Sequence, residues 1–228
     1  EDNMAAQSRF VSDASHELRT PLTALLAANE VASMNPKLTL KQAKQVIADN
    51  VDDVKRLQKL TNSMLGLLKE DKLEIQKGKV GLQPVIARAM NLVVNQALAK
   101  DIAIDDKTKN FLLLGDRQSL EQLFTILLDN AIKYSNKGGT ITISSSKKGK
   151  HVSVAVADAG IGMSDEVKSQ IFTRFYRAEE SRTTAGYGLG LSIAERIIRA
   201  HGGRINVDSE QNVGSTFTVI LPAYNKKK

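Results

Sequence analysis

The sequence predicts an α+β protein in two parts, a helical hairpin over residues 1–72 and a sandwich of one sheet with its helices over residues 73–228. Three observations support this prediction. The first seventy or so residues contain no glycine before Gly66, and their apolar residues recur at heptad spacing. From about residue 73 onward, glycines and alternating β-branched runs appear. Hydrophobic residues make up 42% of the 228 residues, which is enough for each part to bury a core.

The N-terminal part is predicted to contain two long helices. In the first, over about residues 5–34, apolar or small residues recur every seven positions, at Val11, Leu18, Leu25 and Ala32. Asn35-Pro36 interrupts this pattern, and Thr39 is expected to cap the second helix. The second helix carries a seam with alternating spacings of three and four residues, formed by Leu40, Ala43, Ile47, Asn50, Val54, Leu57, Thr61, Met64 and Leu68.

A lone hairpin of this kind would leave half of its apolar surface in water. Two copies that form a four-helix bundle would bury that surface, so we expect an antiparallel hairpin that makes a homodimer. The alternative is a hairpin that packs on the second part of the same chain. The length and continuity of both apolar series favour the dimer.

The second part is predicted to combine strands and helices. Strands are expected at 73–76, 80–82, 102–104, 111–114, 140–146, 152–158, 204–209 and 215–222. Helices are expected at 84–99 and 119–134, in a short segment capped by Ser164, and at 189–201 before the stop at Gly202-Gly203. Residues 140–146 and 152–158 alternate as the two arms of a β-hairpin do. One mixed sheet with helices on one face accommodates this order of elements.

The composition excludes several classes of site. The chain has no cysteine, which excludes disulfides, thiolate zinc sites and cysteine nucleophiles. Its formal charge of +7 is spread along the chain and is not interleaved with aromatic residues, so we expect no nucleic-acid partner. We find no apolar run near the roughly 20 residues of a membrane helix and no signal peptide. A cytoplasmic segment of a longer protein is therefore expected.

His16 is the first candidate for chemistry. In the heptad register that starts at Val11 it takes the outermost position, so we expect an exposed side chain. Glu17 can orient the imidazole through Nδ1 and leave Nε2 free as a nucleophile, and Thr20 lies one turn further on the same face. A surface histidine without a role is the alternative. A zinc helix of the H-E-x-x-H type is excluded, because Thr20 occupies the position of its second histidine.

Two glycine-rich segments are candidates for nucleotide binding. They are Asp158-Ala159-Gly160-Ile161-Gly162 and Gly186-Tyr187-Gly188-Leu189-Gly190. The first follows a predicted strand, so that Asp158 emerges beside a loop that a ligand can approach closely. The second runs into a predicted helix, whose first N–H groups favour phosphate oxygens. Neither segment is a dinucleotide fingerprint or a P-loop, and glycines that merely form turns are the alternative for each alone.

The predicted helix 119–134 ends with a third candidate group. Asn130, Lys133 and Tyr134 lie within about a turn of one another. They could supply an amide oxygen for a metal, a cation for phosphate, and a ring that stacks on a base. An ordinary helix surface is the alternative. The other two histidines, His151 and His201, are interpreted as a strand-edge residue and as a helix C-terminal residue favoured by the helix dipole.

Taken together, these motifs resemble those of the sensor histidine kinases of bacterial two-component systems. SHELRTPL (15–22) is similar to the phosphoacceptor motif of that family. The nucleotide-binding motifs follow in the family's order: DNAIKYS (129–135), DAGIG (158–162), IFTRFYRAEES (171–181), GYGLGLSIAERIIRAHGG (186–203) and GSTFTVILP (214–222). The resemblance covers essentially the whole chain. It implies a HisKA-type dimerisation and phosphotransfer hairpin, followed by a HATPase catalytic domain of the Bergerat type.

The resemblance implies an ATP-dependent protein-histidine kinase. His16 would accept the γ-phosphoryl group of ATP, with Glu17 as the general base, and pass it to an aspartate of a response regulator. Thr20 matches the position that orients water in relatives with phosphatase activity toward the regulator. Kinases of this family are commonly tethered to the cytoplasmic membrane by N-terminal helices, so an anchor of that kind is expected outside the present sequence.

The resemblance also implies roles at the nucleotide site. Asn130 would ligate Mg²⁺, Lys133 would contact phosphate, Tyr134 would pack against the adenine, and Asp158 would bind the adenine amino group. The remaining expected nucleotide-site residues are Gly160, Ile161 and Gly162 in the pocket loop, Arg177 at the γ-phosphate, Gly186, Gly188 and Gly190 in the ATP lid, and Thr216 near the adenine.

One position departs from the family's pattern. Many relatives carry an asparagine four residues before the metal-binding asparagine, where this chain has Ile126. One polar contact to Mg²⁺ or phosphate would therefore be missing. A nucleotide-binding scaffold without autokinase activity is one alternative, although the intact His16 argues against it. Another ATPase of the same fold is a second alternative, and the histidine-bearing hairpin argues against that.

Overall fold

The computed structural model describes residues 2–68, 75–178 and 186–225. The chain divides into two compact units, Glu1–Glu70 and Asp71–Lys228. The first unit is helical and the second combines a sheet with helices, which confirms the predicted α+β class. The predicted boundary between residues 72 and 73 lies outside the described residues. Among the helices that the structure describes, none has both the length and the apolar character needed to cross a membrane.

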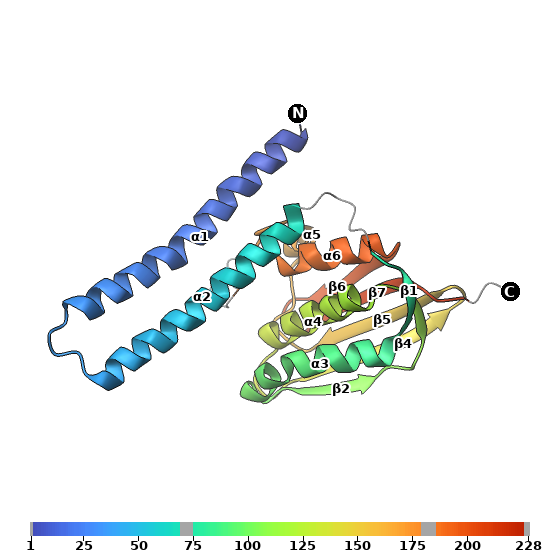
Figure 1. The fold of residues 1–228 in the computed structure, drawn as a ribbon. Helices are drawn as coiled ribbons and strands as arrows, with labels where there is room; N and C mark the ends of the chain where they lie inside the picture. Colours follow the sequence, from blue (N-terminus) through green and yellow to red (C-terminus); the bar gives the residue numbers. More distant parts are fainter. Residues whose placement is uncertain (1, 69–74, 179–185, 226–228) are drawn as a thin grey trace. The chain divides into compact units, whose positions relative to one another are not determined.

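The first unit is a pair of antiparallel helices, α1 (Asp2–Met34) and α2 (Leu40–Leu68), shown in Figure 1. Helix α1 continues through Pro21 as a single element. Thr39 begins α2 with a reciprocal pair of hydrogen bonds. The Gln42 N–H donates to Thr39 Oγ1 at 3.3 Å, and the Thr39 N–H donates to Gln42 Oε1 at 3.0 Å. The predicted helix cap is therefore confirmed.

The predicted apolar seam of α2 is divided between two stripes of the helix. Ala43 and Val46 are half-buried. Ile47 and Val54, which belong to the predicted seam, are 61% and 54% exposed. Both stripes would face the core of a four-helix bundle, so exposure of one stripe in the single chain leaves the predicted seam a prediction.

A polar pair joins the two helices of the hairpin. Asn50 Nδ2 donates to Asn29 Oδ1 at 2.9 Å, and Asn29 Nδ2 donates to Asn50 Oδ1 at 3.3 Å. Asn29 Nδ2 also lies 2.7 Å from the Leu25 carbonyl oxygen, to which it donates. These bonds place Asn29 of α1 opposite Asn50 of α2.

The second unit is built on a five-stranded sheet with the strand order β2-β4-β5-β7-β6. Its strands are β2 (Ala103–Lys107), β4 (Thr140–Lys148), β5 (His151–Asp158), β6 (Arg204–Glu210) and β7 (Gly214–Pro222). β2 pairs parallel to β4, and every other pair is antiparallel. A separate antiparallel pair is formed by β1 (Gly78–Gly81) and β3 (Leu112–Gly115). The predicted mixed sheet is confirmed.

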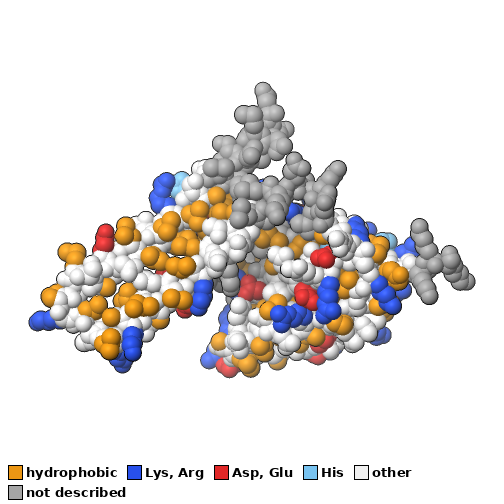
Figure 2. All heavy atoms as spheres, in the orientation of Figure 1, with side chains coloured by type: hydrophobic (Ala, Val, Ile, Leu, Met, Phe, Trp, Pro, Cys, Tyr) orange, Lys and Arg blue, Asp and Glu red, His pale blue; other side chains and the backbone are white. Residues whose placement is uncertain are grey.

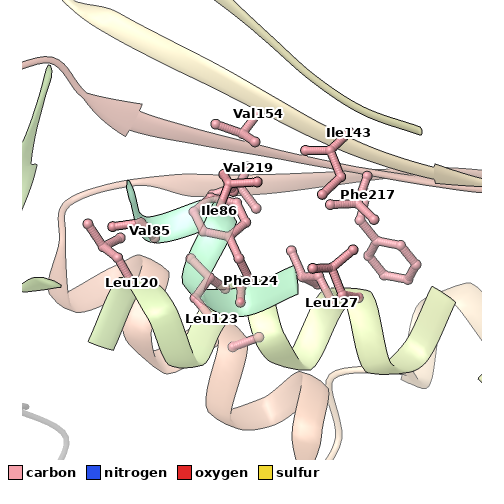
Figure 3. Close-up of a cluster of buried hydrophobic side chains, with 14 of the residues drawn as sticks. Val85, Ile86, Leu120, Leu123, Phe124, Leu127, Ile143, Val154, Phe217 and Val219 are labelled. Atoms are coloured by element: carbon pink, nitrogen blue, oxygen red, sulfur yellow. The ribbon is translucent and has the colours of Figure 1, made fainter. Parts of the chain in front are cut away.

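Helices cover one face of this sheet (Figure 1). They are α3 (Leu82–Ala99), α4 (Arg117–Tyr134) and α6 (Gly190–Ala200), while α5 (Asp165–Gln170) is a short helix after β5. Figure 3 shows how the buried side chains of the helices and the sheet point toward one another. The labelled residues are Val85 and Ile86 from α3, Leu120, Leu123, Phe124 and Leu127 from α4, and Ile143, Val154, Phe217 and Val219 from the sheet.

Most predicted elements of the second unit are present within one or two residues of their expected ends. The strand predicted at 73–76 is an exception, because residues 75–77 are irregular, β1 begins at Gly78, and residues 73–74 lie outside the described residues. Helix α3 begins at Leu82, two residues earlier than predicted, since a proline at position 84 is tolerated in the first turn. Ser164 caps α5 as predicted, accepting a hydrogen bond from the Val167 N–H at 3.4 Å.

His201 lies at the end of α6, as predicted, and is buried. Its side chain is 1% exposed. Nε2 accepts a hydrogen bond from the Asp116 N–H at 3.0 Å, so Nδ1 carries the proton and donates to the Ile197 carbonyl at 2.7 Å. A Cβ on Gly115 would lie 2.6 Å from His201 Cδ2, so only glycine permits this close approach. The predicted place of His201 at the helix C-terminus is confirmed, but the helix dipole does not explain it, because an imidazole that accepts from the Asp116 N–H is neutral.

This arrangement predicts that acid destabilises the second unit. Burial is the main cause that lowers the pKa of His201 from 6.5, and Lys77 adds to it, while Asp116 and the Ile197 carbonyl oppose it. The unfolded chain therefore takes up a proton before the folded chain does. Stability is fully present above pH 6.5 and declines as the pH falls toward the folded pKa, by at most about 1.4 kcal/mol per pH unit for one proton.

Urea unfolding followed by tyrosine fluorescence measures this effect, because all 4 tyrosines of the chain belong to the second unit. The free energy of unfolding of the wild type should fall between about pH 7 and pH 5, and that of His201→Gln should fall less. His151→Gln removes an exposed histidine and serves as the matched control. A wild-type pH dependence in His201→Gln would contradict the prediction.

Candidate functional site

A pocket of about 420 Å³ lies in the second unit, where the end of β5 meets α4, α5 and the start of α6. Most of its wall is apolar, with a few polar side chains, as is usual for small-molecule sites. The apolar and aromatic lining residues include Tyr134, Ile161, Met163, Val167, Ile171, Tyr176, Leu191 and Phe217. The polar lining residues include Asn130, Asp158, Ser164, Glu166, Arg177, Gln211 and Ser215.

Asp158 ends β5 and is one of the acidic residues that line the pocket, together with Glu166. Its carboxylate accepts a hydrogen bond from the Gly160 N–H at 2.9 Å and another from the Ser215 N–H. Burial raises the pKa of Asp158, and the two N–H donors lower it in part. A fixed carboxylate in an apolar pocket is complementary to a ligand group that donates hydrogen bonds.

The glycines after Asp158 permit two close approaches of the backbone. A Cβ on Gly160 would lie 2.2 Å from the Tyr134 carbonyl oxygen. Gly162 has a φ of +62°, and a Cβ there would lie 1.8 Å from the Glu210 carbonyl oxygen. The residue between them is anchored on both sides: the Ile161 N–H donates to Tyr134 O at 3.1 Å, and the Asn212 N–H donates to Ile161 O at 2.7 Å. Gly162 and Ile161 line the pocket, while Gly160 supports it from outside the lining.

Lys100 fixes the end of α4, the helix that carries Asn130 and Tyr134. Its Nζ donates to the carbonyl oxygens of Ile132, Lys133 and Ser135 at 2.9, 2.7 and 2.8 Å. Carbonyl groups in the last turn of a helix lack helical partners, and a positive charge is favourable there. Sequence reasoning missed Lys100, because its position next to α4 depends on the packing of α3 and not on local pattern.

Lys133 and the second glycine segment lie beside the pocket, outside its lining. Lys133 Nζ is 2.5 Å from a carboxylate oxygen of Asp129, with which it forms an ion pair. A Cβ on Gly186 would lie 3.7 Å from that same Nζ. Gly188 adopts a φ of +68°, and Gly190 begins α6. The predicted phosphate-binding groups are therefore next to one another, although the pocket wall does not include them.

The predicted phosphoacceptor residues belong to α1, in the other unit. His16 is exposed, as its heptad position predicts. Glu17 is half-buried, and Thr20 Oγ1 donates to the His16 carbonyl oxygen at 3.4 Å, one turn along the helix. An imidazole on the surface of a helix is accessible to a second molecule or to another part of the chain.

Comparison with known proteins identifies both units. Residues 6–72 match the His Kinase A (phospho-acceptor) domain, and residues 115–225 match the histidine kinase-, DNA gyrase B-, and HSP90-like ATPases. The sensor protein CiaH of Streptococcus pneumoniae is 33% identical over 238 residues, which is 100% of this chain and 52% of CiaH. The sensor histidine kinase YkoH of Bacillus subtilis is 36% identical over 226 residues, which is 96% of this chain and 48% of YkoH. The chain belongs to the sensor histidine kinase family.

This histidine kinase chain spans about half the length of the curated relatives it matches. Solved structures have the same architecture. Full-length ShkA in complex with AMPPNP has a TM-score of 0.71 and 25% identity, and the match covers 97% of this chain and 47% of ShkA. ThkA in complex with the response regulator protein TrrA has a TM-score of 0.78 and 23% identity, covering 98% of this chain and 64% of ThkA. The second match concerns the fold alone.

On β7, the hydroxyl group that lines the pocket is that of Ser215 rather than that of Thr216. Side chains of β7 alternate between the two faces of the sheet, and the buried set is Ser215, Phe217, Val219 and Leu221. Ser215 and Phe217 line the pocket, whereas Thr216 does not. The expectation for Thr216 is therefore corrected, because its register directs it to the opposite face of the sheet. The apolar alternation along β7 was the signal that could have shown this.

Ile126 lies outside the pocket lining and packs against the core of the second unit. A Cβ on Gly190 would lie 3.3 Å from Ile126 Cγ2, so the isoleucine contacts the first residue of α6. An apolar side chain is suited to this contact. At this departure from the family's pattern, the Ile126 side chain packs against the core, whereas many relatives carry a polar asparagine at this position.

Proposed function

We propose that this segment of a histidine kinase binds ATP in the pocket beside Asp158, transfers the γ-phosphoryl group to His16, and passes it to an aspartate of a response regulator. In this proposal, residues 1–72 form the dimerisation and phosphotransfer domain, and residues 73–228 form the domain that binds ATP and catalyses the transfer. The observation that carries the proposal is that His16 is exposed on a helical hairpin that matches the phospho-acceptor domain. The second unit of the same chain matches the ATPase family and contains a pocket.

The chemistry of the first step follows from the imidazole. Nε2 of neutral His16 attacks the γ-phosphorus of ATP, the bond to the bridging oxygen breaks, and ADP leaves. The proton on Nδ1 passes to the carboxylate of Glu17, the neighbouring residue on α1, which is half-buried. The product holds a phosphorus–nitrogen bond, which is labile enough for the group to be passed to a carboxylate of the regulator.

Residues of the pocket wall would bind the nucleotide. Asp158 would accept hydrogen bonds from the adenine amino group, with Ser215 beside it, and Tyr134 would pack against the base. Arg177 lines the pocket and would face the γ-phosphate. These contacts position the nucleotide and neutralise its charge, which is the main requirement of phosphoryl transfer.

Phosphate contacts would come from the groups beside the pocket. Lys133 would exchange its ion pair with Asp129 for a phosphate oxygen, since the two acceptors compete for one ammonium group. Gly186, Gly188 and Gly190 would supply backbone N–H groups near the first turn of α6.

The donor set suits a magnesium ion that is held chiefly by the nucleotide. Within the described ranges, no group of three or more His, Asp or Glu side chains is arranged to hold a metal. Asn130 supplies one amide oxygen in the pocket, and Mg²⁺ commonly takes its other ligands from phosphates and water. When bound, the ion would neutralise charge on the β- and γ-phosphates. Asn130 would hold it on the α4 side of the pocket.

Thr20 would serve a phosphatase activity toward the regulator. Its hydroxyl lies one turn from His16, where it could orient water against a phospho-aspartate docked on the hairpin. The histidine kinase ThkA, which shares this fold, forms a complex with the response regulator protein TrrA, and this supports a regulator as the partner of this chain too.

A homodimer is proposed for the hairpin, because the partner helix of the same hairpin leaves a second apolar stripe exposed among its described residues. Figure 2 shows hydrophobic side chains (orange) along the hairpin. The exposed apolar residues of α1 and α2 include Leu22, Leu26, Leu40, Ile47, Val51 and Val54. A four-helix bundle of two hairpins would bury this stripe.

We expect the double variant Ile47→Lys, Val54→Lys to be monomeric, because two charges on the stripe would have to be desolvated in the bundle. Sedimentation velocity of the wild type and the variant measures the association state. Leu98→Lys, which changes an exposed leucine of α3, is the matched control and should leave the dimer intact. A dimeric double variant would contradict the proposed interface.

Incubation of the chain with γ-labelled ATP and Mg²⁺ tests the proposed function. Label that is stable in base and labile in acid is expected, since a phosphohistidine has these properties and a phosphoserine does not. A chain that binds ATP but takes up no label would instead support the scaffold alternative. Ile126→Asn would then be the first variant to assay, because Ile126 stands where many relatives have a polar group.

A further inference from the structure

Two serine hydroxyls on the sheet lie within hydrogen-bond distance of each other, and one of them, that of Ser215, lines the pocket. Ser209 on β6 and Ser215 on β7 are directly paired across the two strands. Their hydroxyl oxygens are 2.9 Å apart, and Ser209 Oγ also donates to the Gly214 carbonyl oxygen at 3.0 Å. Ser209 is half-buried and Ser215 is buried, so water does not readily replace these bonds.

The direction of the bond between the two hydroxyls follows from counting protons. A serine hydroxyl has one proton and two lone pairs. A carbonyl oxygen can only accept, so the proton of Ser209 is used in the bond to Gly214. The bond between the serines must then be donated by Ser215 and accepted by Ser209. Ser215 Oγ is left with lone pairs alone for any other partner.

The side chains of Ser215 and Asp158 consequently present acceptors to the pocket. Ser215 and Asp158 both line the pocket. The Asp158 carboxylate is held in place by N–H groups of Gly160 and Ser215, which are donors on the protein side. A ligand meets two acceptors here, which suits an amino group, whereas a ligand carbonyl would face unpaired oxygen atoms.

We propose that Ser209 is a positioning residue for base selectivity: by accepting the proton of Ser215, it keeps the Ser215 hydroxyl from donating into the pocket beside Asp158 and so favours 6-amino over 6-oxo purines. The inference rests on the proposed binding of ATP. Ser209 acts through Ser215 and needs no contact with the nucleotide itself. Without the Ser209 hydroxyl, the proton of Ser215 is free to turn toward a 6-oxo group.

The test compares the affinities of the full chain for ADP and IDP by titration calorimetry, since neither nucleotide can transfer a γ-phosphoryl group. The selectivity is the ratio of the Kd for IDP to the Kd for ADP. Ser209→Val and Ser209→Thr are a matched pair of equal shape, of which only threonine keeps a hydroxyl. We expect Ser209→Val to lower the selectivity by about three- to tenfold, the effect of one hydrogen bond, and Ser209→Thr to keep the wild-type value.

Two further variants separate this role from a structural one. Ser153→Ala makes the same kind of change on β5, outside the pocket, and should leave the selectivity unchanged. Ser209→Val in a Ser215→Ala background should have no further effect on selectivity, because the proton that Ser209 positions is then gone. A purely structural role would lower both affinities equally and would leave the ratio as it is.

Three results would overturn the inference. The first is that Ser209→Val keeps the wild-type ratio of the Kd for IDP to the Kd for ADP. The second is that Ser209→Thr loses as much selectivity as Ser209→Val does. The third is that the Ser209 and Ser215 variants change the selectivity additively. If Ser209→Val does not fold, Ser209→Ala takes its place and must give the same reduced ratio. A wild-type chain that bound neither ADP nor IDP would overturn the proposed ATP binding itself, an outcome distinct from binding both without preference.

Discussion

The His16→Gln variant is expected to take up no label from γ-labelled ATP while it binds ADP as tightly as the wild type. Glutamine keeps a polar side chain of similar size but has no nitrogen that can attack phosphorus. Loss of a nucleophile lowers rates by at least about a thousandfold, which places labelling below detection. His16 is exposed on α1, so the substitution removes no buried contact and the fold should be unchanged.

Filter-bound label and ADP calorimetry on the same preparations measure both parts of this prediction. His151→Gln is the matched control, since it removes an exposed histidine from the other unit and should label as the wild type does. Persistent acid-labile label in His16→Gln would assign the phosphoacceptor to another residue. Loss of ADP binding in the same variant would point to a structural effect.

The sequence alone located Asp158 and the pocket loop because their signals are local. A strand that ends in aspartate, followed by glycine at alternate positions, predicts a carboxylate at a strand end and a backbone that can approach other chain segments. The structure has this arrangement at Gly160 and Gly162, which lie against the carbonyl groups of Tyr134 and Glu210. Sequence could not name those two partners, because they come from α4 and from the end of β6.

Residues whose role depends on strand register or helix face were harder to predict. Ser215 and Thr216 are adjacent hydroxyls, and only the alternation set by Phe217 and Val219 places Ser215 on the pocket side of β7. The same limit applies to α2, where spacing predicted the helix but not which of its two apolar stripes, those of Val46 and Ile47, faces α1.

Side chains that act across long sequence separations left no signal at all. Lys100 reaches the last turn of α4 from the end of α3. His201 reaches the backbone of Asp116, 85 residues away in sequence, and is neutral there. Both depend on how helices pack on the sheet, and no local pattern in a single sequence carries that information.

Gly162→Ala is expected to impair both stability and autophosphorylation by disrupting the pocket wall. A methyl group at this position would lie 1.8 Å from the Glu210 carbonyl oxygen and 2.6 Å from its carbon, and the φ of +62° is itself unfavourable for alanine. The turn between β6 and β7 must move away, which breaks the bond from the Asn212 N–H to Ile161 O. We expect the free energy of unfolding of the second unit to fall by about 3–5 kcal/mol, and autophosphorylation by roughly a hundredfold or more.

Gly138→Ala is the control that separates two effects of Gly162→Ala, the strain of a positive φ and the clash with the Glu210 carbonyl group. Gly138 has a similar φ of +77°, but nothing lies within 4 Å of a Cβ built there. Its alanine variant should therefore lose only the about 1–2 kcal/mol of a left-handed alanine and keep wild-type ADP affinity. Urea unfolding followed by tyrosine fluorescence, together with ADP calorimetry, measures both variants. Equal losses in the two variants would mean that backbone conformation alone accounts for the glycine at 162, whereas a larger loss in Gly162→Ala assigns the difference to the contact between the pocket loop and β6.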